Sequence, residues 1–166
     1  MSGAGAPTPT INPQDTAGLS LAIVAASWHT QIMDGLLDGA RRAAQEAGIE
    51  PLIVRVPGTF ELPVAAAHLA EKFDALVALG VVVRGDTPHF DYVCDAATSG
   101  LTKVSVESKT PIGFGVLTCH TEQQGLDRAG LAGSSEDKGY EATAAALETV
   151  VALRKLVSAT NAQEMS

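Results

Sequence analysis

Apolar and polar residues follow one another along the chain in blocks that predict strands separated by helices. Residues 75–83 carry no polar side chain, and this run is too short to span a membrane but fits a strand buried on both faces. Shorter apolar runs occupy residues 19–26, 52–56 and 112–118. We therefore expect four strands, with residues 75–83 in the centre of the sheet.

Between these runs, apolar residues recur at helical spacing. After the first strand the spacing predicts a helix that Gly48 and Pro51 end. The other expected helices are one capped by Thr59 and ending near residue 73, one from about His89 to Ser108, a short one from a capping box at residues 121–124 to Gly130, and a long C-terminal one capped by Ser134 or Ser135.

Strands that alternate with helices predict βαβ units and right-handed crossovers. We expect a three-layer α/β/α sandwich of the flavodoxin-like type, with a mainly parallel four-stranded sheet. The sequence predicts a single domain over residues 18–160. A flexible arm rich in Gly, Ala, Pro and Thr is expected at residues 1–17, and a tail at residues 161–166.

Composition and charge narrow the choice of partners. The net charge of -8 argues against nucleic acid, because binding to the phosphate backbone needs clustered Lys and Arg. The sequence shows neither a membrane span nor a secretion signal, and Cys94 and Cys119 have no metal-ligand spacing. Free thiols in a reducing cytoplasm are the simplest interpretation. His29, His68 and His120 show no ligand spacing either, so no metal is expected.

Unusual residues gather in the loops that follow the predicted strands, where open parallel sheets bind ligands. The turn from Gly85 to Thr87, followed by Pro88, can direct backbone N–H groups at an anion such as phosphate. His89 then begins a helix and has a side chain suited to proton transfer near neutral pH, although a histidine there is also common as a plain surface residue.

Other candidates in these loops each allow two interpretations. Trp28 can be a core residue or a stacking platform for a heterocycle. Glu61 can complement a helix dipole or accept hydrogen bonds from a polyol. Arg128 can pair with an acid or clamp a phosphate through its two-pronged guanidinium, and Lys138 is most simply a solvated charge.

Taken together, these residues resemble the 6,7-dimethyl-8-ribityllumazine synthases of riboflavin biosynthesis. The resemblance covers roughly residues 19–156, and its most specific segments are residues 56–63, 80–93, 111–118 and 124–130. One departure follows the first strand, where many members carry Arg-Phe-Asn and this chain has Ser27-Trp28-His29.

The resemblance implies an enzyme that condenses 5-amino-6-(D-ribitylamino)uracil with 3,4-dihydroxy-2-butanone 4-phosphate, releasing phosphate and water without a cofactor or a metal. It implies that His89 is the general acid and base. It also implies these binding roles: Trp28 stacks on the pyrimidine, the backbone at Val82 and Val83 contacts the ring edge, Thr59, Phe60 and Glu61 hold the ribityl chain, and Gly85, Asp86, Thr87 and Arg128 bind phosphate, with the Asp86 side chain turned away.

In this family the site lies between subunits, which implies that Phe114, Arg128 and Lys138 come from the adjacent chain. Members form free pentamers or shells of twelve pentamers. The connection at residues 129–139 is about two residues longer than in shell-forming members, and Glu136 and Asp137 add charge there. We therefore expect a pentamer. Two alternatives stay open at this point: an archaeal-type riboflavin synthase, and a non-catalytic protein that binds lumazine or flavin or forms a shell.

Overall fold

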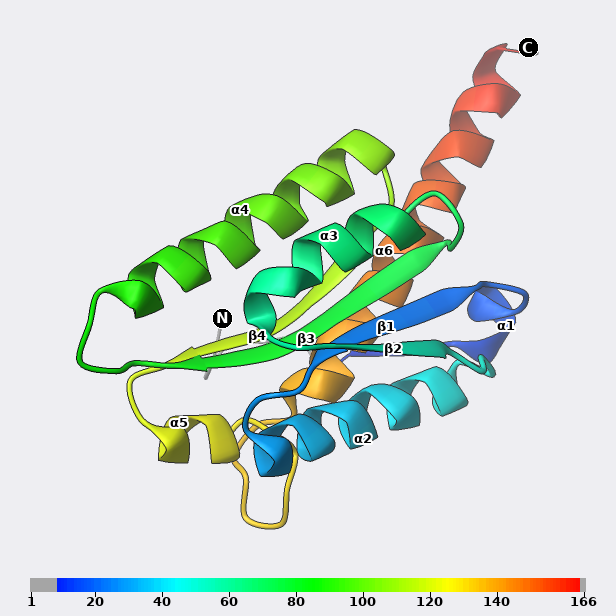
Figure 1. Ribbon diagram of the computed structural model, residues 1–166. Helices are drawn as coiled ribbons and strands as arrows, with labels where there is room; N and C mark the ends of the chain where they lie inside the picture. The colour runs from blue at the N-terminus through cyan, green and yellow to red at the C-terminus, as the bar shows by residue number, and fades with distance from the viewer. Residues whose placement is uncertain (1–8, 165–166) are drawn as a thin grey trace.

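The computed structural model describes residues 9–164 and contains one parallel sheet with strand order β2-β1-β3-β4 (Figure 1). Helices cover both faces, so the predicted three-layer α/β/α sandwich is confirmed. The strands are β1 (Leu21–Ala26), β2 (Leu52–Val56), β3 (Ala75–Val83) and β4 (Ile112–Cys119). The helices are α1 (Pro13–Thr16), α2 (Thr30–Glu46), the 3-10 helix η1 (Thr59–Glu61), α3 (Leu62–Leu69), α4 (His89–Ser108), α5 (Glu122–Leu126) and α6 (Lys138–Glu164).

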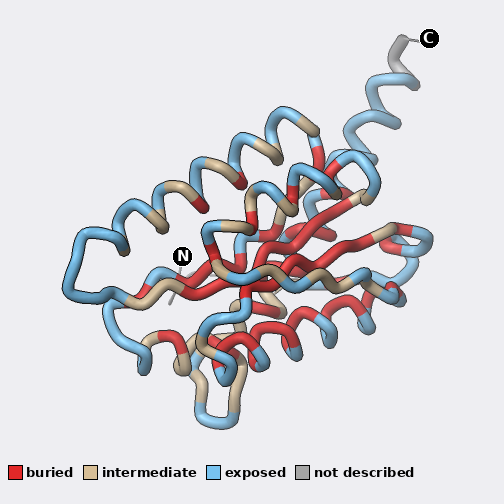
Figure 2. Tube along the Cα trace, in the orientation of Figure 1, coloured by how far each residue is buried: buried red, intermediate tan, exposed pale blue. Residues whose placement is uncertain are grey.

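The side chains of β1 alternate between two separate apolar cores, as the pleat of a strand requires. Leu21 and Ile23 pack with the buried faces of α2 and α6 on one side of the sheet. Ala22 and Val24 pack with α3 and α4 on the other side. Every residue of β1 is buried, as Figure 2 shows, which accounts for its unbroken apolar sequence.

The central strand β3 is longer than its neighbour β1. The pairing of the two strands ends at Leu79 with Ala25, whereas the pairing of β3 with β4 continues to Val83 with Cys119. Residues 80–83 therefore have a strand partner on one side only. This overhang of β3 lies at the carboxyl end of the sheet, where a parallel sheet offers room for a ligand.

The prediction that Thr59 caps the following helix is wrong. Thr59 begins η1, and its hydroxyl donates to the carbonyl oxygen of Val81 at 3.3 Å. The side chain of Glu61 caps η1 rather than α3, because its Oε2 accepts from the Gly58 N–H at 2.8 Å. Helix α3 ends at Leu69, earlier than expected, since the chain must turn there to reach Asp74, whose carboxylate accepts from the Ser20 N–H and hydroxyl.

The predicted cap of the last helix is wrong as well. The N–H of Tyr140 donates to Asp137 Oδ1 at 3.0 Å, so Asp137 caps α6. The hydroxyls of Ser134 and Ser135 instead donate to the carbonyl oxygens of Leu126 and Asp127. These serines stabilise the loop before α6 rather than the helix.

Part of the expected N-terminal arm is packed on the domain. Ile11 is buried, the N–H of Thr10 donates to Glu148 of α6, and the hydroxyl of Thr16 donates to the carbonyl oxygen of Ala47 after α2. Residues 1–8 of that arm lie outside the described residues. At the other end α6 continues to Glu164, beyond the expected start of the tail at residue 161.

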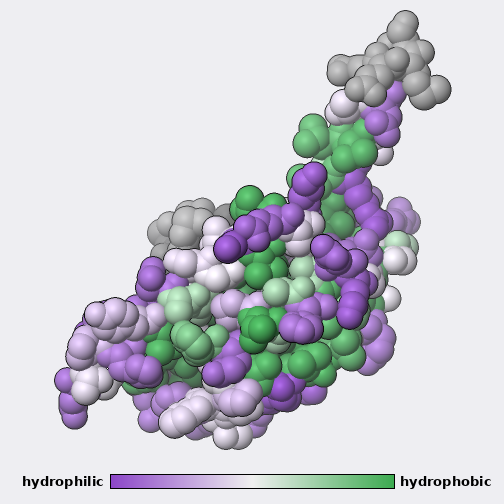
Figure 3. Space-filling model, turned by 45° about the horizontal axis from the view of Figure 1, so that its top comes forward, coloured by the Kyte–Doolittle hydropathy of each residue, from purple (hydrophilic) through white to green (hydrophobic). Residues whose placement is uncertain are grey.

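The last turns of α6 project from the body of the molecule (Figure 1). They carry exposed Leu153, Leu156 and Val157, and Figure 3 shows apolar side chains along this projection. Within residues 9–164, no helix combines the length and the apolar character that crossing a bilayer requires.

Candidate active site

A hollow of about 340 Å³ opens at the carboxyl ends of β1, β2 and β3. Three loops and the first turns of α4 surround it. Several of the side chains that the sequence singled out thus come together from separate parts of the chain. The lining residues are Trp28, His29, Gly58, Thr59, Phe60, Glu61, Val81, Val82, Val83, His89 and Val93.

Backbone forms much of one wall, because the overhang of β3 borders the hollow with Val81, Val82 and Val83. The segment η1 lies beside this overhang and is tied to it by the hydroxyl of Thr59. Close packing fixes the two segments. A Cβ on Gly80 would lie 2.7 Å from Thr59 Oγ1, so only glycine permits this approach. Thr59 is 5% exposed and its hydroxyl proton is used within the chain, whereas its contact with a ribityl chain stays a prediction.

Two exposed aromatic rings border the hollow. Trp28 is 69% exposed and Phe60 is 62% exposed, which is unusual for such large apolar side chains. A core role for Trp28 is therefore wrong. Exposed rings next to a hollow offer flat faces on which a heterocycle can stack.

Two polar side chains in the hollow can act on a ligand. Glu61 uses Oε2 to accept from the Gly58 N–H, which fixes the carboxylate while Oε1 has further acceptor capacity. His89 is the first residue of α4 and is exposed. Glu61 thus offers an acceptor for hydroxyl groups, and His89 offers a group for proton transfer.

The turn before His89 offers backbone donors. Within the described chain, the N–H groups of residues 85–87 donate to no other residue. Arg84 anchors the turn, because its N–H donates to the carbonyl oxygen of Cys119 and its guanidinium donates to Asp91 at 2.7 Å. The same guanidinium lies 4.4 Å from the centre of the Phe90 ring. Such a fixed turn with unused N–H groups suits an anion.

Six predicted residues do not line the hollow of their own chain. Three of them, Gly85, Asp86 and Thr87, form the turn just before His89, and the other three are Phe114, Arg128 and Lys138. Phe114 lies on the edge strand β4 and is 47% exposed. Arg128 Nη1 donates to the carbonyl oxygen of Gln124 at 2.9 Å, and Arg128 Nε lies 3.9 Å from Glu136. Both Arg128 and Lys138 belong to the part of the chain between α5 and the start of α6.

Lys138 is held between two carboxylates. Its ammonium lies 2.5 Å from Glu136 and 2.6 Å from Glu141. Burial by itself lowers the pKa of Lys138, but the two carboxylates outweigh it and raise that pKa above its ordinary value. Lys138 therefore stays charged, and the interpretation of a plain solvated charge is wrong.

Sequence reasoning missed His29, which lines the hollow beside Trp28. Its backbone lies in the left-handed region, with φ of 57°, and its Nδ1 lies 3.6 Å from Glu122 Oε1 on α5. The sequence feature that could have identified His29 as a site residue is its position directly after Trp28 at the end of the first strand. The left-handed backbone that turns the side chain toward the hollow could not be foreseen from the residue type.

Neither cysteine is a candidate nucleophile. Cys94 and Cys119 are free, and burial raises the pKa of both thiols, which disfavours the reactive thiolate. Among the described residues, no group of three or more His, Cys, Asp and Glu side chains is arranged to hold a metal ion.

Comparison with known proteins gives a consistent result. A family model described as 6,7-dimethyl-8-ribityllumazine synthase matches residues 18–154. Proteins of that name are similar over nearly the whole chain. One from Paenarthrobacter aurescens is 72% identical and the alignment covers 93% of this chain and 99% of the relative. Another from Micrococcus luteus is 66% identical, with 93% and 98% covered. A third from Streptomyces coelicolor is 58% identical, with 94% and 97% covered.

Proposed function

The chain belongs to the 6,7-dimethyl-8-ribityllumazine synthase family of transferases in riboflavin biosynthesis, and we propose which of its residues carry the reaction. The reaction condenses 5-amino-6-(D-ribitylamino)uracil with 3,4-dihydroxy-2-butanone 4-phosphate. The hollow at the carboxyl ends of the strands holds both substrates. A single observation carries this proposal: Trp28, Glu61, His89 and the overhang of β3 border one hollow.

The pyrimidine stacks on the exposed ring of Trp28, and its polar edge pairs with the backbone at Val82 and Val83. Phe60 and Glu61 hold the ribityl chain, with Glu61 accepting from its hydroxyl groups. Thr59 acts by holding η1 against β3. This arrangement fixes the 5-amino group in one orientation, and orientation is a major source of acceleration when two substrates must meet.

His89 moves the protons of the reaction. The 5-amino group attacks the ketone and forms an imine with loss of water. A proton then leaves the adjacent carbon as phosphate departs, and His89 accepts it through its imidazole. The elimination leaves an enol. The protonated imidazole returns its proton to the terminal carbon of this enol, and loss of the enol hydroxyl proton to solvent gives the second carbonyl, with His89 again neutral. The ribitylamino nitrogen then attacks this carbonyl, and loss of a second water completes the ring.

The phosphate group of the ketose binds at the turn from Gly85 to Thr87, where the backbone N–H groups are unused. We expect the side chain of Asp86 to turn away from the phosphate, because two negative charges repel. Arg128 of an adjacent subunit completes this site. The supporting observation is that no Lys or Arg lines the hollow within residues 9–164, although a phosphate ester needs a cation. Phe114 and Lys138 of the adjacent subunit then complete the pyrimidine and ribityl contacts.

A site shared in this way requires a closed ring, and we propose a homopentamer. The length of the connection between α5 and α6 supports it. The additional argument from exposed acids at Glu136 and Asp137 is not supported, because Glu136 pairs with Lys138 and Asp137 pairs with Arg42 within the chain. A cytoplasmic location is proposed from the two free thiols, which suit a reducing compartment.

The direct test mixes the purified chain with the two substrates and follows the absorbance of the lumazine together with released phosphate. Equal rates of the two signals are expected. An archaeal-type riboflavin synthase would instead consume the lumazine and form riboflavin without releasing phosphate. Product formation without phosphate release, or no reaction of the well-folded chain, would contradict the proposal.

A further inference from the structure

We infer that Arg42 is a positioning residue for Arg128: through its ion pair with Asp137, it sets the loop that presents Arg128 to the phosphate of the substrate. This inference rests on the proposed role of Arg128. Arg42 lies on α2 and touches neither the hollow nor Arg128 itself. Its effect must therefore pass through the loop that joins α5 to α6.

The loop is a compact hairpin in which Arg128 and Lys138 are paired through the backbone. The N–H of Lys138 donates to the carbonyl oxygen of Arg128 at 2.9 Å. Next to this bond, Ala129 and Asp137 form an antiparallel bridge, and the N–H of Gly130 donates to the carbonyl oxygen of Glu136 at 3.0 Å. A displacement of Asp137 therefore moves Arg128, because Asp137 faces Ala129, and Ala129 and Asp137 are the chain neighbours of the paired residues Arg128 and Lys138.

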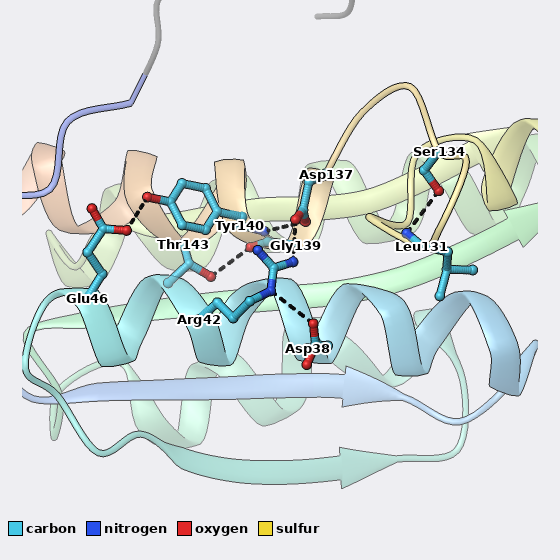
Figure 4. A network of polar contacts seen from close by, with 9 residues as sticks. All are labelled: Asp38, Arg42, Glu46, Leu131, Ser134, Asp137, Gly139, Tyr140 and Thr143. Atoms are coloured by element: carbon cyan, nitrogen blue, oxygen red, sulfur yellow. Dashed lines mark hydrogen bonds and ion pairs between the residues drawn. The ribbon is translucent and has the colours of Figure 1, made fainter.

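Asp137 holds the root of this hairpin to two helices (Figure 4). One carboxylate oxygen accepts from the Tyr140 N–H and caps α6, and the other accepts from Arg42 Nη2 at 2.5 Å. Arg42 Nε donates to Asp38 at 2.9 Å, so the guanidinium is held from both sides. These hydrogen bonds to Asp137 and Asp38 raise the pKa of Arg42, which remains charged at every relevant pH.

The contact between α2 and the loop is tight enough to transmit a shift. A Cβ on Gly39 of α2 would lie 2.2 Å from Asp137 Oδ1, and one on Gly139 of α6 would lie 2.0 Å from the carbonyl oxygen of Leu36. Backbone therefore packs on backbone at this point, with no flexible side chain between. One turn further, the hydroxyl of Tyr140 donates to Glu46 at 2.6 Å and extends the contact (Figure 4).

The ion pair between Arg42 and Asp137 fixes the position of the loop more than it stabilises the folded chain. The side chain of Arg42 is 46% exposed and that of Asp137 is 26% exposed, and pairs with such access to water contribute little to the free energy of folding. The two-pronged guanidinium, by contrast, fixes direction as well as distance, which an ammonium group does not. A residue with this role should affect the binding of one substrate more than the stability of the chain.

The test compares steady-state kinetics of the full chain with those of three variants. Arg42→Met removes the charge and keeps most of the length, Arg42→Lys keeps the charge and loses the fork, and Arg128→Ala removes the clamp itself. Asp38→Asn is the matched control, since it removes the charge of the other partner of Arg42 and leaves the pair with Asp137. The measured quantities are kcat, KM for each substrate and Tm.

Arg42→Met should raise KM for the ketose phosphate about 3- to 10-fold, with kcat and KM for the pyrimidine changed less than about twofold. Arg42→Lys should lie between Arg42→Met and the parent, and Asp38→Asn should match the parent. In the background of Arg128→Ala, Arg42→Met should raise KM no further, because both changes then act on the same contact.

The outcomes separate this inference from the proposed function. If Arg128→Ala raises KM for the ketose phosphate but Arg42→Met does not, only the positioning role is overturned. The same holds if the two changes are additive, because the two residues then act independently. It also holds if Arg42→Met impairs both substrates equally, because that result indicates general damage. If Arg128→Ala leaves KM for the ketose phosphate unchanged, both the clamp and the positioning role are wrong.

Discussion

The hydroxyl of Thr59 joins η1 to the overhang of β3, and Thr59→Val tests how much this bond matters. The substitution replaces the hydroxyl by a methyl group of similar size at a position that is 5% exposed. It removes the donor that lies 3.3 Å from the carbonyl oxygen of Val81. Loss of a partner in a buried hydrogen bond costs about 1–3 kcal/mol, and the length of this bond favours the lower half of that range.

We therefore expect Thr59→Val to lower the free energy of unfolding by about 1–2 kcal/mol, which for a domain of this size lowers Tm by about 2–8 °C. The new methyl group also faces Gly80, where space is short, so η1 should shift away from β3. Because η1 carries Phe60 and Glu61, KM for the pyrimidine should rise severalfold.

Thermal melts and steady-state kinetics measure both effects, with Thr59→Ser as the matched control. Serine loses the methyl group and some stability but keeps the hydroxyl, so KM for the pyrimidine should remain within about twofold of the parent. A Thr59→Val chain with the Tm and KM of the parent would refute the reasoning. Equal increases in KM for both variants would show that packing, and not the hydrogen bond, holds η1.

The remaining predictions concern catalysis, pH and assembly. His89→Ala should lower kcat about 10-fold or more, whereas His68→Ala on the outer side of α3 should not, and an unchanged kcat for His89→Ala would exclude proton transfer by this residue. Burial by itself raises the pKa of Asp74. Hydrogen bonds from Ser20 and the charge of Arg154 lower this pKa by more, so that it lies below its ordinary value of 3.8. A lowered pKa in the folded chain stabilises it above the ordinary pKa of an aspartate, and this stabilisation is lost as the pH falls through the lowered pKa. Asp74→Asn should therefore lower Tm at pH 7, and the difference should shrink as the pH falls below 3.8. Light scattering should report about five times the chain mass of 17.0 kDa, and particles of about sixty chains would contradict the pentamer.

Most of the sheet could be predicted from the sequence, because burial on both faces leaves an unmistakable apolar pattern. The bounds of β3 and β2 are those that the pattern predicted, and so are those of α4. The helix caps could not be predicted in the same way. Ser134 and Asp137 are both good capping residues, and the contacts that distinguish them, such as the bond of Asp137 with Arg42, join residues up to 95 positions apart in sequence.

The candidate site was likewise predictable in part. The sequence placed Trp28, Glu61 and His89 in loops that parallel strands bring to one edge of a sheet, and in the structure they border one hollow. Thr59 also lines that hollow, but its hydroxyl is turned to Val81, a direction that only the folded chain reveals. Arg128 does not line the hollow of its own chain, and its proposed place there depends on a second copy that a single chain cannot reveal.

The overhang of β3 has a consequence for inhibitors. A ligand that pairs with the edge of residues 80–83 is held by N–H and carbonyl groups, and every residue type except proline supplies both of these groups. A side-chain substitution at residues 81–83 leaves the same groups at the same edge, and proline in a strand removes a donor and damages the sheet. Resistance to such an inhibitor is therefore expected elsewhere around the hollow, for example at Trp28 or Phe60, where a mutation would also remove a proposed contact with the substrate.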